Sequence, residues 1–270
     1  MQTTGAALLE AMYETGIEYL FANLGSDHTA LVEALAAGRR AGKKLPQIVT
    51  CPHEMVALTA AHGFAQVSGR AQAVVVHVDC GTQSLAGAIH NAAKGRVPVL
   101  IFAGTSPVTQ EGEARGSRNE FIQWIQDVFD QRGIVRGYVR YDNEIRRGEN
   151  VKQLVHRAMQ FAYSDPKGPV YLMASREVLE SEVPPVALDT SRWVPVAPSP
   201  LPPDAPAMIA DALAKARRPL VVTSYLGRNP KAVEELLRLC RRLGVGVFES
   251  VPSYMNYPGD DPMHQGVQWI

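Results

Sequence analysis

The stretch Ala73-Val-Val-Val-His-Val-Asp-Cys-Gly-Thr82 places a continuous apolar segment directly before a short polar one. A run of β-branched residues without alternating polar positions is typical of a strand that is covered on both faces, as at the centre of a parallel sheet. His77 interrupts this run near its end, and residues 79–82 are predicted to turn tightly into a helix at 83–94. The stretch therefore predicts a central strand with polar residues at its carboxyl end.

Outward from this strand, short apolar runs alternate with longer amphipathic ones along the chain. That alternation is typical of βαβ units, so the predicted fold class is α/β, a doubly wound and mostly parallel sheet. The further predicted strands lie at 17–22, 47–50, 97–103 and 169–174, with a weak one at 137–140, and the predicted helices include 29–37, 54–68, 120–129 and 151–163.

A change in composition divides the chain. Prolines recur between Pro184 and Pro206, which predicts a stiff, extended linker that builds no packed core. We therefore expect one domain at 1–183, a Pro-rich linker at 184–206 and a partial second α/β domain at 207–270. This last segment holds about one and a half βαβ repeats, so we expect the domain to be cut short, with a small natural appendage as the alternative.

Composition excludes several classes of function. Lys+Arg and Asp+Glu are equal at 27 each, so no overall field attracts nucleic acid or an anionic membrane. The three cysteines are odd in number and form no C-x-x-C pair, which argues against a disulfide framework and against structural zinc. The N-terminus has no signal-peptide pattern and no apolar run approaches the ~20 residues of a membrane span, so we expect a cytoplasmic protein.

Ligands of open α/β sheets bind beyond the carboxyl ends of the strands. Four segments are predicted to stand there: 23–26, 53–54, 77–82 and 104–106. No metal site is expected among them, because Cys51 and His53 are two potential ligands without a third nearby.

Each candidate residue in these segments has a structural alternative. Glu54 is either a functional carboxylate or a helix-start charge that the macrodipole favours. Ser26 and Asp27 fit an N-cap and a charge at a helix start. His77 is either a core histidine with satisfied hydrogen bonds, which is the commoner case in general, or a functional residue, which its position at a strand end among valines favours. Gly81-Thr82 before a helix could bind a phosphate, although a two-residue signal is weak.

Taken in order, these segments resemble the N-terminal pyrimidine-binding domain of thiamine diphosphate-dependent 2-oxo acid decarboxylases and acetolactate synthases. The resemblance covers about residues 3–180 and resumes after the linker. The residues that carry it are Tyr19-Leu-Phe-Ala-Asn-Leu-Gly-Ser26, His53-Glu-Met-Val-Ala-Leu-Thr-Ala-Ala-His-Gly-Phe-Ala65, His77-Val-Asp-Cys-Gly-Thr-Gln-Ser-Leu-Ala-Gly-Ala88, Val97-Pro-Val-Leu-Ile-Phe-Ala-Gly104 and Gly168-Pro-Val-Tyr-Leu172.

In detail the pattern is most similar to that of benzoylformate decarboxylases, which have counterparts of Gly25-Ser26, His77 and Gly81-Thr82. Asp79 departs from that pattern and from the one typical of acetolactate synthases. It places a carboxylate beside the expected substrate pocket, where it would repel a 2-oxo acid unless a cation offsets it. The substrate class is therefore left open.

The resemblance implies roles for the candidate residues. Glu54 would accept a hydrogen bond from the cofactor aminopyrimidine and thereby activate the cofactor, thiamine diphosphate. Gly25, Gly81 and Thr82 would contribute to cofactor binding. Ser26 would orient the carboxylate of a 2-oxo acid substrate, and His77 would transfer protons.

The resemblance also implies that part of the site lies outside this sequence. In this family Mg²⁺ holds the diphosphate through a Gly-Asp-Gly and Asn pattern, and the string Pro258-Gly-Asp-Asp-Pro262 lacks the continuation of that pattern. We therefore expect the chain to be inactive alone, with the diphosphate site further along a longer polypeptide or on a second chain. A homodimer or tetramer is expected, and FAD or an ADP-like group in the second domain is left undetermined.

Two other classes of function stay open, and the choice between decarboxylation and carboligation stays open with them. One is a non-catalytic or regulatory subunit that binds the cofactor only with a separate diphosphate-binding chain. The other is a doubly wound binding module that merely places an acid at a strand end.

Overall fold

The computed structural model describes residues 1–268, and its N-terminal unit (1–198) is built on a six-stranded sheet. The strand order is β3-β2-β4-β5-β7-β6, and every neighbouring pair is parallel. The predicted doubly wound α/β fold is thereby confirmed. The strands are β2 (Tyr19–Ala22), β3 (Gln47–Thr50), β4 (Ala73–Val76), β5 (Leu100–Thr105), β6 (Asp142–Glu144) and β7 (Val170–Ser175). Two short strands, β1 (Gln2–Thr3) and β8 (Glu182–Val183), pair antiparallel beside the sheet.

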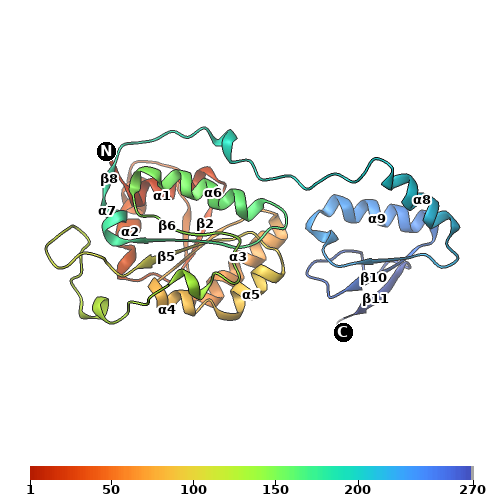
Figure 1. The fold of residues 1–270 in the computed structure, drawn as a ribbon, viewed down its shortest axis with the longest axis horizontal. Helices are drawn as coiled ribbons and strands as arrows, with labels where there is room; N and C mark the ends of the chain where they lie inside the picture. The colour runs from red at the N-terminus through yellow and green to blue at the C-terminus, as the bar shows by residue number, and fades with distance from the viewer. Residues whose placement is uncertain (269–270) are drawn as a thin grey trace. The chain divides into compact units, whose positions relative to one another are not determined.

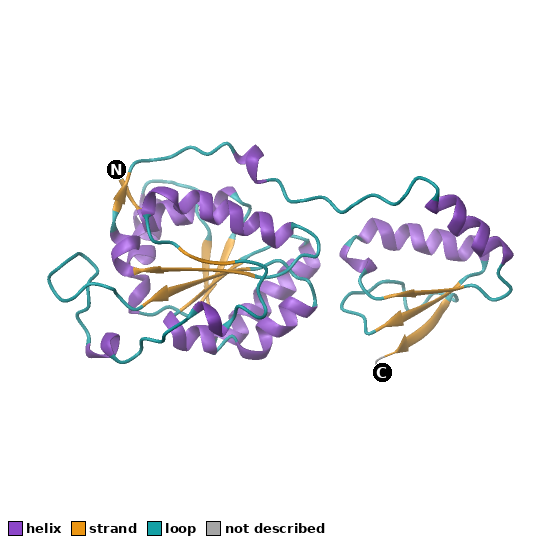
Figure 2. Cartoon of the chain, viewed as in Figure 1, coloured by secondary structure: helices purple, strands orange, loops and turns teal. Residues whose placement is uncertain are grey.

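Helices cover both faces of this sheet (Figures 1 and 2). One layer consists of α1 (Thr4–Glu14), α2 (Thr29–Arg40) and α6 (Val151–Tyr163), and the other of α3 (Glu54–Ser68), α4 (Val78–Gln83) and α5 (Ala86–Lys94). The short helix α7 (Arg176–Glu180) follows β7. None of the described helices combines the length and apolar character that crossing a bilayer requires.

Strand β4 has the environment that its composition predicts. Val74, Val75 and Val76 are at most 1% exposed, because helices cover both faces of the sheet at its centre. The main core lies between the sheet and the α1, α2 and α6 layer, where large side chains such as Met12 and Phe102 are fully buried. Burial of this apolar area fixes the strand ends in place and so positions the residues that follow them.

The segment after β4 differs from the prediction. Residues 79–82 do not form a turn ahead of one long helix, since α4 begins at Val78 and a break at Leu85–Ala86 separates it from α5. Val78 has a φ of 30°, which is rare for a β-branched residue. The Asp27 carboxylate accepts the Val78 N–H, and the Thr82 hydroxyl donates to the Val78 carbonyl. These two side-chain bonds hold the abrupt turn from strand to helix.

The predicted helix at 120–129 was wrong, because only a 3₁₀ turn, η2 (Phe121–Trp124), forms there. Side chains satisfy backbone groups that a helix would pair internally: Gln123 Oε1 accepts from the Asn119 and Glu120 amides, and Arg118 donates to the Gln123 carbonyl. The predicted strand at 137–140 was also wrong, since the edge strand of the sheet is β6 at 142–144.

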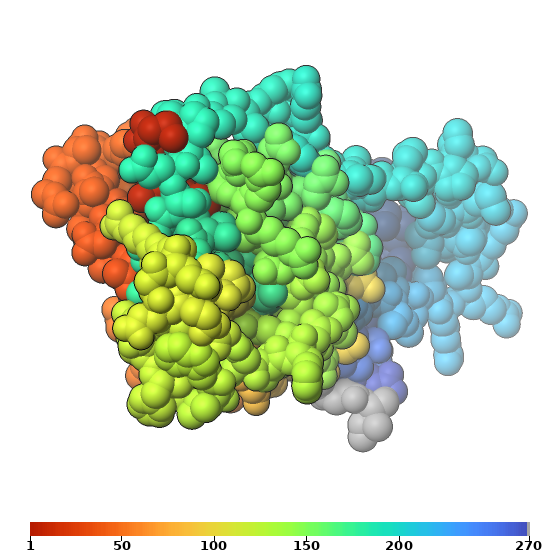
Figure 3. Space-filling view, turned by 60° about the vertical axis from the view of Figure 1, so that its left-hand side comes forward, coloured from red at the N-terminus to blue at the C-terminus, as the bar shows by residue number. Residues whose placement is uncertain are grey.

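The apolar side chains of this segment are exposed at the surface of the described chain. Phe121, Ile125 and Phe129 are all at least 70% exposed. The segment, yellow to yellow-green, occupies much of the face seen in Figure 3.

The second unit, from residue 199 onwards, is a smaller α/β unit. Its three parallel strands lie in the order β11-β10-β9. Its elements are α8 (Ala205–Lys215), β9 (Leu220–Thr223), α9 (Pro230–Leu243), β10 (Gly246–Ser250) and β11 (His264–Gln268). Strand β11 was not predicted from the sequence. The division between the units falls inside the segment predicted as a linker, and Val194 and Val196 of that segment hydrogen-bond to α6 through Gln160 and Ser164.

The end of β5 generates a stability prediction. A Cβ at Gly104 would lie 1.7 Å from Asp27 Oδ2, so Gly104→Ala should lower the free energy of unfolding by about 2 kcal/mol through overpacking. Gly63→Ala is the matched control, because its Cβ would meet nothing within 4 Å and alanine favours the interior of α3 by about 0.5–1 kcal/mol. Urea unfolding of both variants measures the difference, and equal stabilities would show that the end of β5 is not crowded.

Candidate functional site

The candidate site lies at the carboxyl ends of β2, β3 and β4. The chain passes from β2 outward to β3 and then returns to β4 on the other side of β2, so the direction of winding reverses at this point. Open α/β sheets bind ligands in the crevice at such a reversal. Asn23 and Gly25 follow β2, Glu54 follows β3 and His77 follows β4.

Glu54 opens α3 but does not cap it. The His53 side chain accepts the Met55 amide proton at 3.0 Å and thereby fills the N-cap position. The Glu54 carboxylate turns instead toward β2, where Oε1 accepts a hydrogen bond from Asn23 Nδ2 at 3.0 Å. Glu54 is only 8% exposed, and Oε2 receives no hydrogen bond from any described residue. A carboxylate this buried with one oxygen uncommitted favours the functional interpretation over capping.

Gly81 keeps the space beside Glu54 free. A Cβ at this position would lie 3.3 Å from Glu54 Oε1 and 3.2 Å from Val76 Cβ, so any larger residue would crowd the carboxylate. The structure therefore brings Gly81 and Glu54 together, as expected for two residues of one site.

A second buried carboxylate, Asp27, lies beside His77. Asp27 is 3% exposed, its Oδ1 is 2.6 Å from His77 Nδ1, and its Oδ2 accepts the Val78 amide proton at 3.2 Å. His28, which is fully buried, has its Nδ1 3.2 Å from the same Oδ1. The interpretation of Asp27 as a helix-start charge was therefore incomplete, because the side chain is committed to His77.

The pKa values of these groups shift in different directions. Burial alone would raise the pKa of Asp27, but the charge of His28 and the hydrogen bond from His77 outweigh it, and the net shift is downward. The hydrogen bond to Asp27 raises the pKa of His77 despite burial, and the charges of Asp79 and Glu54 act in the same direction. Burial lowers the pKa of His28, so this ring loses its proton at a lower pH than His77 does.

Gly25 has a structural reason in this arrangement. A Cβ there would lie 2.1 Å from His77 Nδ1, so only glycine leaves room for the imidazole next to Asp27. The Gly25 amide donates to His28 Nδ1 at 3.1 Å. Ser26 is the next residue, and its exposed side chain lies at the same edge of the sheet.

The expectation that Gly81-Thr82 precedes a helix was wrong, because both residues lie within α4. Thr82 is 1% exposed, and its hydroxyl bonds to the Val78 carbonyl at 2.7 Å and to the Tyr171 hydroxyl at 2.9 Å. Gln131 donates to that same Tyr171 hydroxyl and to the Gly104 carbonyl. The Thr82 hydroxyl therefore supports the inner wall of the site and has no bond to offer to a phosphate.

Asp79 is a third buried carboxylate of this edge. It is 8% exposed, Oδ2 accepts from Gln83 Nε2 at 3.2 Å, and Oδ1 has no partner among the described residues. The neighbouring Cys80 is exposed. No group of three or more His, Cys, Asp and Glu side chains in residues 1–268 is arranged to hold a metal ion.

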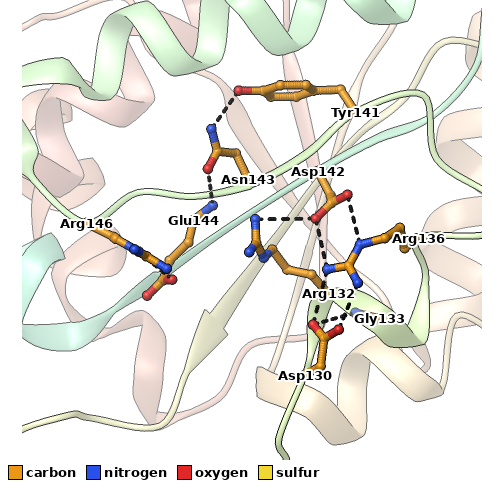
Figure 4. Close-up of polar contacts among 9 residues, drawn as sticks. All are labelled: Asp130, Arg132, Gly133, Arg136, Tyr141, Asp142, Asn143, Glu144 and Arg146. Carbon is orange, nitrogen blue, oxygen red and sulfur yellow. Dashed lines mark hydrogen bonds and ion pairs between the residues drawn. The ribbon is translucent and has the colours of Figure 1, made fainter.

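A second polar cluster lies at the edge of the sheet formed by β6, opposite the edge formed by β3 (Figure 4). Arg136 bonds to Asp130 and Asp142, Arg132 pairs with Asp142, and Arg146 pairs with Glu144. Each of these arginines already faces a carboxylate, so the cluster ties the segment around Asp130 to β6 and presents no uncommitted cation to an anionic ligand.

Two cavities of the N-terminal unit also lie away from Glu54. A cavity of about 410 Å³ between α1 and α2 is lined mostly by small side chains such as Ala30 and Ala34. Another of about 280 Å³ at the end of β5 includes Ser106 and Glu144. Neither contains Glu54 or His77, so the residues with unusual burial and charge remain those of the winding reversal.

Residues 23–28, 54 and 77–81 together form a site whose composition can be compared with known proteins. Residues 2–134 match the family described as thiamine pyrophosphate enzyme, N-terminal TPP binding domain. The N-terminal unit belongs to this family. The recognition made from the sequence is thereby confirmed, whereas the roles of individual residues of this TPP-binding domain stay predictions.

Relatives extend the similarity over nearly the whole chain. A probable 2-ketoarginine decarboxylase of Pseudomonas aeruginosa is 28% identical over 266 residues, and a probable acetolactate synthase large subunit of Methanocaldococcus jannaschii is 24% identical over 270 residues. The matches cover 98% and 97% of this chain but 44% and 42% of those relatives, so the chain spans less than half of their length.

The fold of the TPP-binding domain is also that of solved structures. A thiamine diphosphate-dependent 4-hydroxybenzoylformate decarboxylase of Rhodococcus jostii superposes with a TM-score of 0.77 and 21% identity, covering 98% of this chain and 47% of that one.

Sequence reasoning missed Asn23 and His28 as residues of the site, and it gave Asp27 only the role of a helix-start charge. All three residues directly follow the apolar strand β2. Polar side chains at the carboxyl end of a strand were the signal that could have identified them. Their partners could not be read from the sequence, because Glu54 and His77 are brought to them only by the pairing of β2 with β3 and β4.

The Asp27–His77 pair predicts a pH-dependent contribution to stability. The folded-state pKa of His77 lies above 6.5, so its contribution is fully present below that value and is lost as the pH rises through the folded-state pKa. The folded-state pKa of Asp27 lies below 3.8, so that carboxylate stays ionised in the same range. We expect the loss of unfolding free energy caused by His77→Gln to be larger near about pH 5.5 than near about pH 9. A loss independent of pH in urea unfolding would contradict the pairing.

Proposed function

We propose that the chain supplies the pyrimidine-binding half of the active site of a thiamine diphosphate-dependent enzyme that acts on 2-oxo acids. The observation that carries this proposal is the Glu54 carboxylate, which is buried and held at Oε1 by Asn23, whereas Oε2 accepts no hydrogen bond from a described residue and has His53 Nδ1 3.9 Å away. The family of residues 2–134 and the names of the relatives support it.

The residues of the site fit the aminopyrimidine end of the cofactor. Such a ring presents N–H donors, and Glu54 Oε2 is an acceptor that lacks a donor among the described residues. Gly81 leaves the space next to that carboxylate unfilled. When bound, thiamine diphosphate supplies an electron sink for breaking or forming the bond next to a carbonyl group.

Glu54 is assigned the role of holding a proton on the pyrimidine ring. An ionised carboxylate stabilises a protonated ring nitrogen far better than a neutral amide does, because the hydrogen bond is charge-assisted. Asn23 fixes the orientation of the carboxylate by its bond to Oε1. This arrangement acts on the cofactor and leaves the choice of substrate to other residues.

Substrate handling is assigned to Ser26 and His77. The exposed Ser26 hydroxyl would orient the substrate carboxylate, and His77 would accept or release protons at the ring nitrogen that does not face Asp27. Asp79 adds a negative charge next to His77, and the raised pKa of His77 supplies the cation that offsets it. The relatives include a probable decarboxylase and a probable acetolactate synthase, so we assign the site to 2-oxo acid chemistry without choosing between the two reactions.

The remaining half of the site is assigned to another domain. We propose that this domain binds the diphosphate through Mg²⁺, that the chain does not hold the cofactor tightly or turn over substrate alone, and that the assembled cytoplasmic enzyme is a homodimer or tetramer. In this assembly residues 207–270 form part of the central domain. We assign neither FAD nor ADP to that part.

Replacement of Glu54 tests the proposal directly. In the enzyme assembled with a diphosphate-binding domain of a relative, Glu54→Gln should lower turnover of a 2-oxo acid by about 100-fold or more, because the ring loses its charged acceptor. Glu33→Gln removes an exposed carboxylate of α2 and should leave turnover unchanged. Equal turnover in the two variants would sink the assignment of Glu54.

Calorimetric titration with thiamine diphosphate and Mg²⁺ separates the alternatives. Binding by the chain only together with the complementing domain supports the half-site. Binding without turnover of any 2-oxo acid supports a non-catalytic subunit, and no binding in either condition supports a module that only shares the fold.

A further inference from the structure

We propose that Asp27 is a positioning residue that holds the His77 imidazole in one tautomer, with the proton on Nδ1 bound to Asp27 and with Nε2 free for proton transfer. The part that concerns proton transfer rests on the proposed function, whereas the tautomer is a property of this chain alone.

Both oxygens of Asp27 act as acceptors. Oδ1 lies 2.6 Å from His77 Nδ1, and Oδ2 accepts the Val78 N–H at 3.2 Å. An ionised carboxylate has no proton to give, so the hydrogen of the shorter bond belongs to His77 Nδ1. In the neutral ring Nε2 is then the acceptor, and a proton that arrives at Nε2 creates an imidazolium whose charge Asp27 stabilises.

Two glycines leave the space that this pair of side chains occupies. A Cβ at Gly25 would meet His77 Nδ1 at 2.1 Å, and a Cβ at Gly104 would meet Asp27 Oδ2 at 1.7 Å. Val78 keeps a φ of 30° while its N–H is bound to Asp27. Strained backbone of this kind persists only where the surroundings fix it, and it clusters at functional sites.

His28 has the opposite tautomer and does not compete for the role. Its Nδ1 accepts the Gly25 amide proton at 3.1 Å, so in the neutral ring the proton sits on Nε2. His28 is 0% exposed, and a ring buried to this extent cannot exchange protons with a substrate.

The charged groups that face His77 come from three elements. Asp27 and His28 lie on η1 (Ser26–His28), Asp79 lies on α4 and Glu54 opens α3. The three carboxylates all favour the charged ring, but only Asp27 contacts a ring nitrogen. Loss of Asp79 should therefore change the charge of His77 without changing its tautomer, whereas loss of Asp27 should change both.

Nitrogen NMR of the chain labelled in its histidine rings tests this inference. The chain has seven histidines, and His77→Gln identifies the signals of His77 by their disappearance. Above its titration midpoint, His77 of the wild-type chain should show a protonated Nδ1 and an unprotonated Nε2. A protonated Nε2 in that spectrum would overturn the proposal.

Asp27→Asn and Asp79→Asn are matched variants, because each removes one buried carboxylate of the same edge. Asparagine at position 27 replaces one of the two carboxylate oxygens with an NH₂ group, so either His77 Nδ1 or the Val78 N–H would face a donor instead of an acceptor. We expect Asp27→Asn to lower the titration midpoint of His77 and to abolish its single tautomer. Asp79→Asn should lower the midpoint less and keep the tautomer. Identical effects of the two variants would show that Asp27 acts only through its charge.

The outcome is independent of the proposed function. If His77 shows the expected tautomer but the chain binds no cofactor even with a complementing domain, the proposed function is contradicted. The role of Asp27 then remains intact. Cofactor binding with the opposite tautomer would contradict the role of Asp27 alone.

Discussion

The buried carboxylate of Asp27 is the constraint on which the carboxyl edge of the sheet depends. It accepts bonds from His77 and from the Val78 backbone, and it fills the space that Gly104 leaves open at the end of β5. A buried carboxylate is costly unless its oxygens are paired, so the ends of β2 and β4 must lie side by side to satisfy it. The abrupt turn into α4, and with it Gly81 next to Glu54, follows from that requirement.

Two carboxylates at this edge differ in what they leave unpaired. Asp27 uses both oxygens inside the protein, whereas Glu54 leaves Oε2 without a donor among the described residues. The first is therefore suited to fixing another side chain and the second to receiving a ligand. Ser26, exposed at the same edge, is the residue to which we assign the substrate carboxylate in the proposed function.

The sequence predicted the sheet well because β4 and β5 are buried on both faces, and a continuous run of apolar residues is specific for that environment. It also singled out Glu54 and His77, whose polar side chains stand out at the ends of such runs. The roles of Asp27 and Thr82 were not predicted, because each depends on partners far away in the sequence, His77 and Tyr171. The segment around Phe121 has helical spacing, yet Arg118 and Gln123 satisfy its backbone in another way, which no periodicity reveals.

The central claim is that Glu54 receives the pyrimidine ring of thiamine diphosphate. A crystal structure of the chain assembled with a diphosphate-binding domain, thiamine diphosphate and Mg²⁺ tests it most directly through the distance from Glu54 Oε2 to the nearest pyrimidine ring nitrogen. We predict a hydrogen bond of about 2.7–3.0 Å, with Asn23 still bound to Oε1. A bound cofactor whose pyrimidine ring lies beyond hydrogen-bond reach of Glu54 would contradict it.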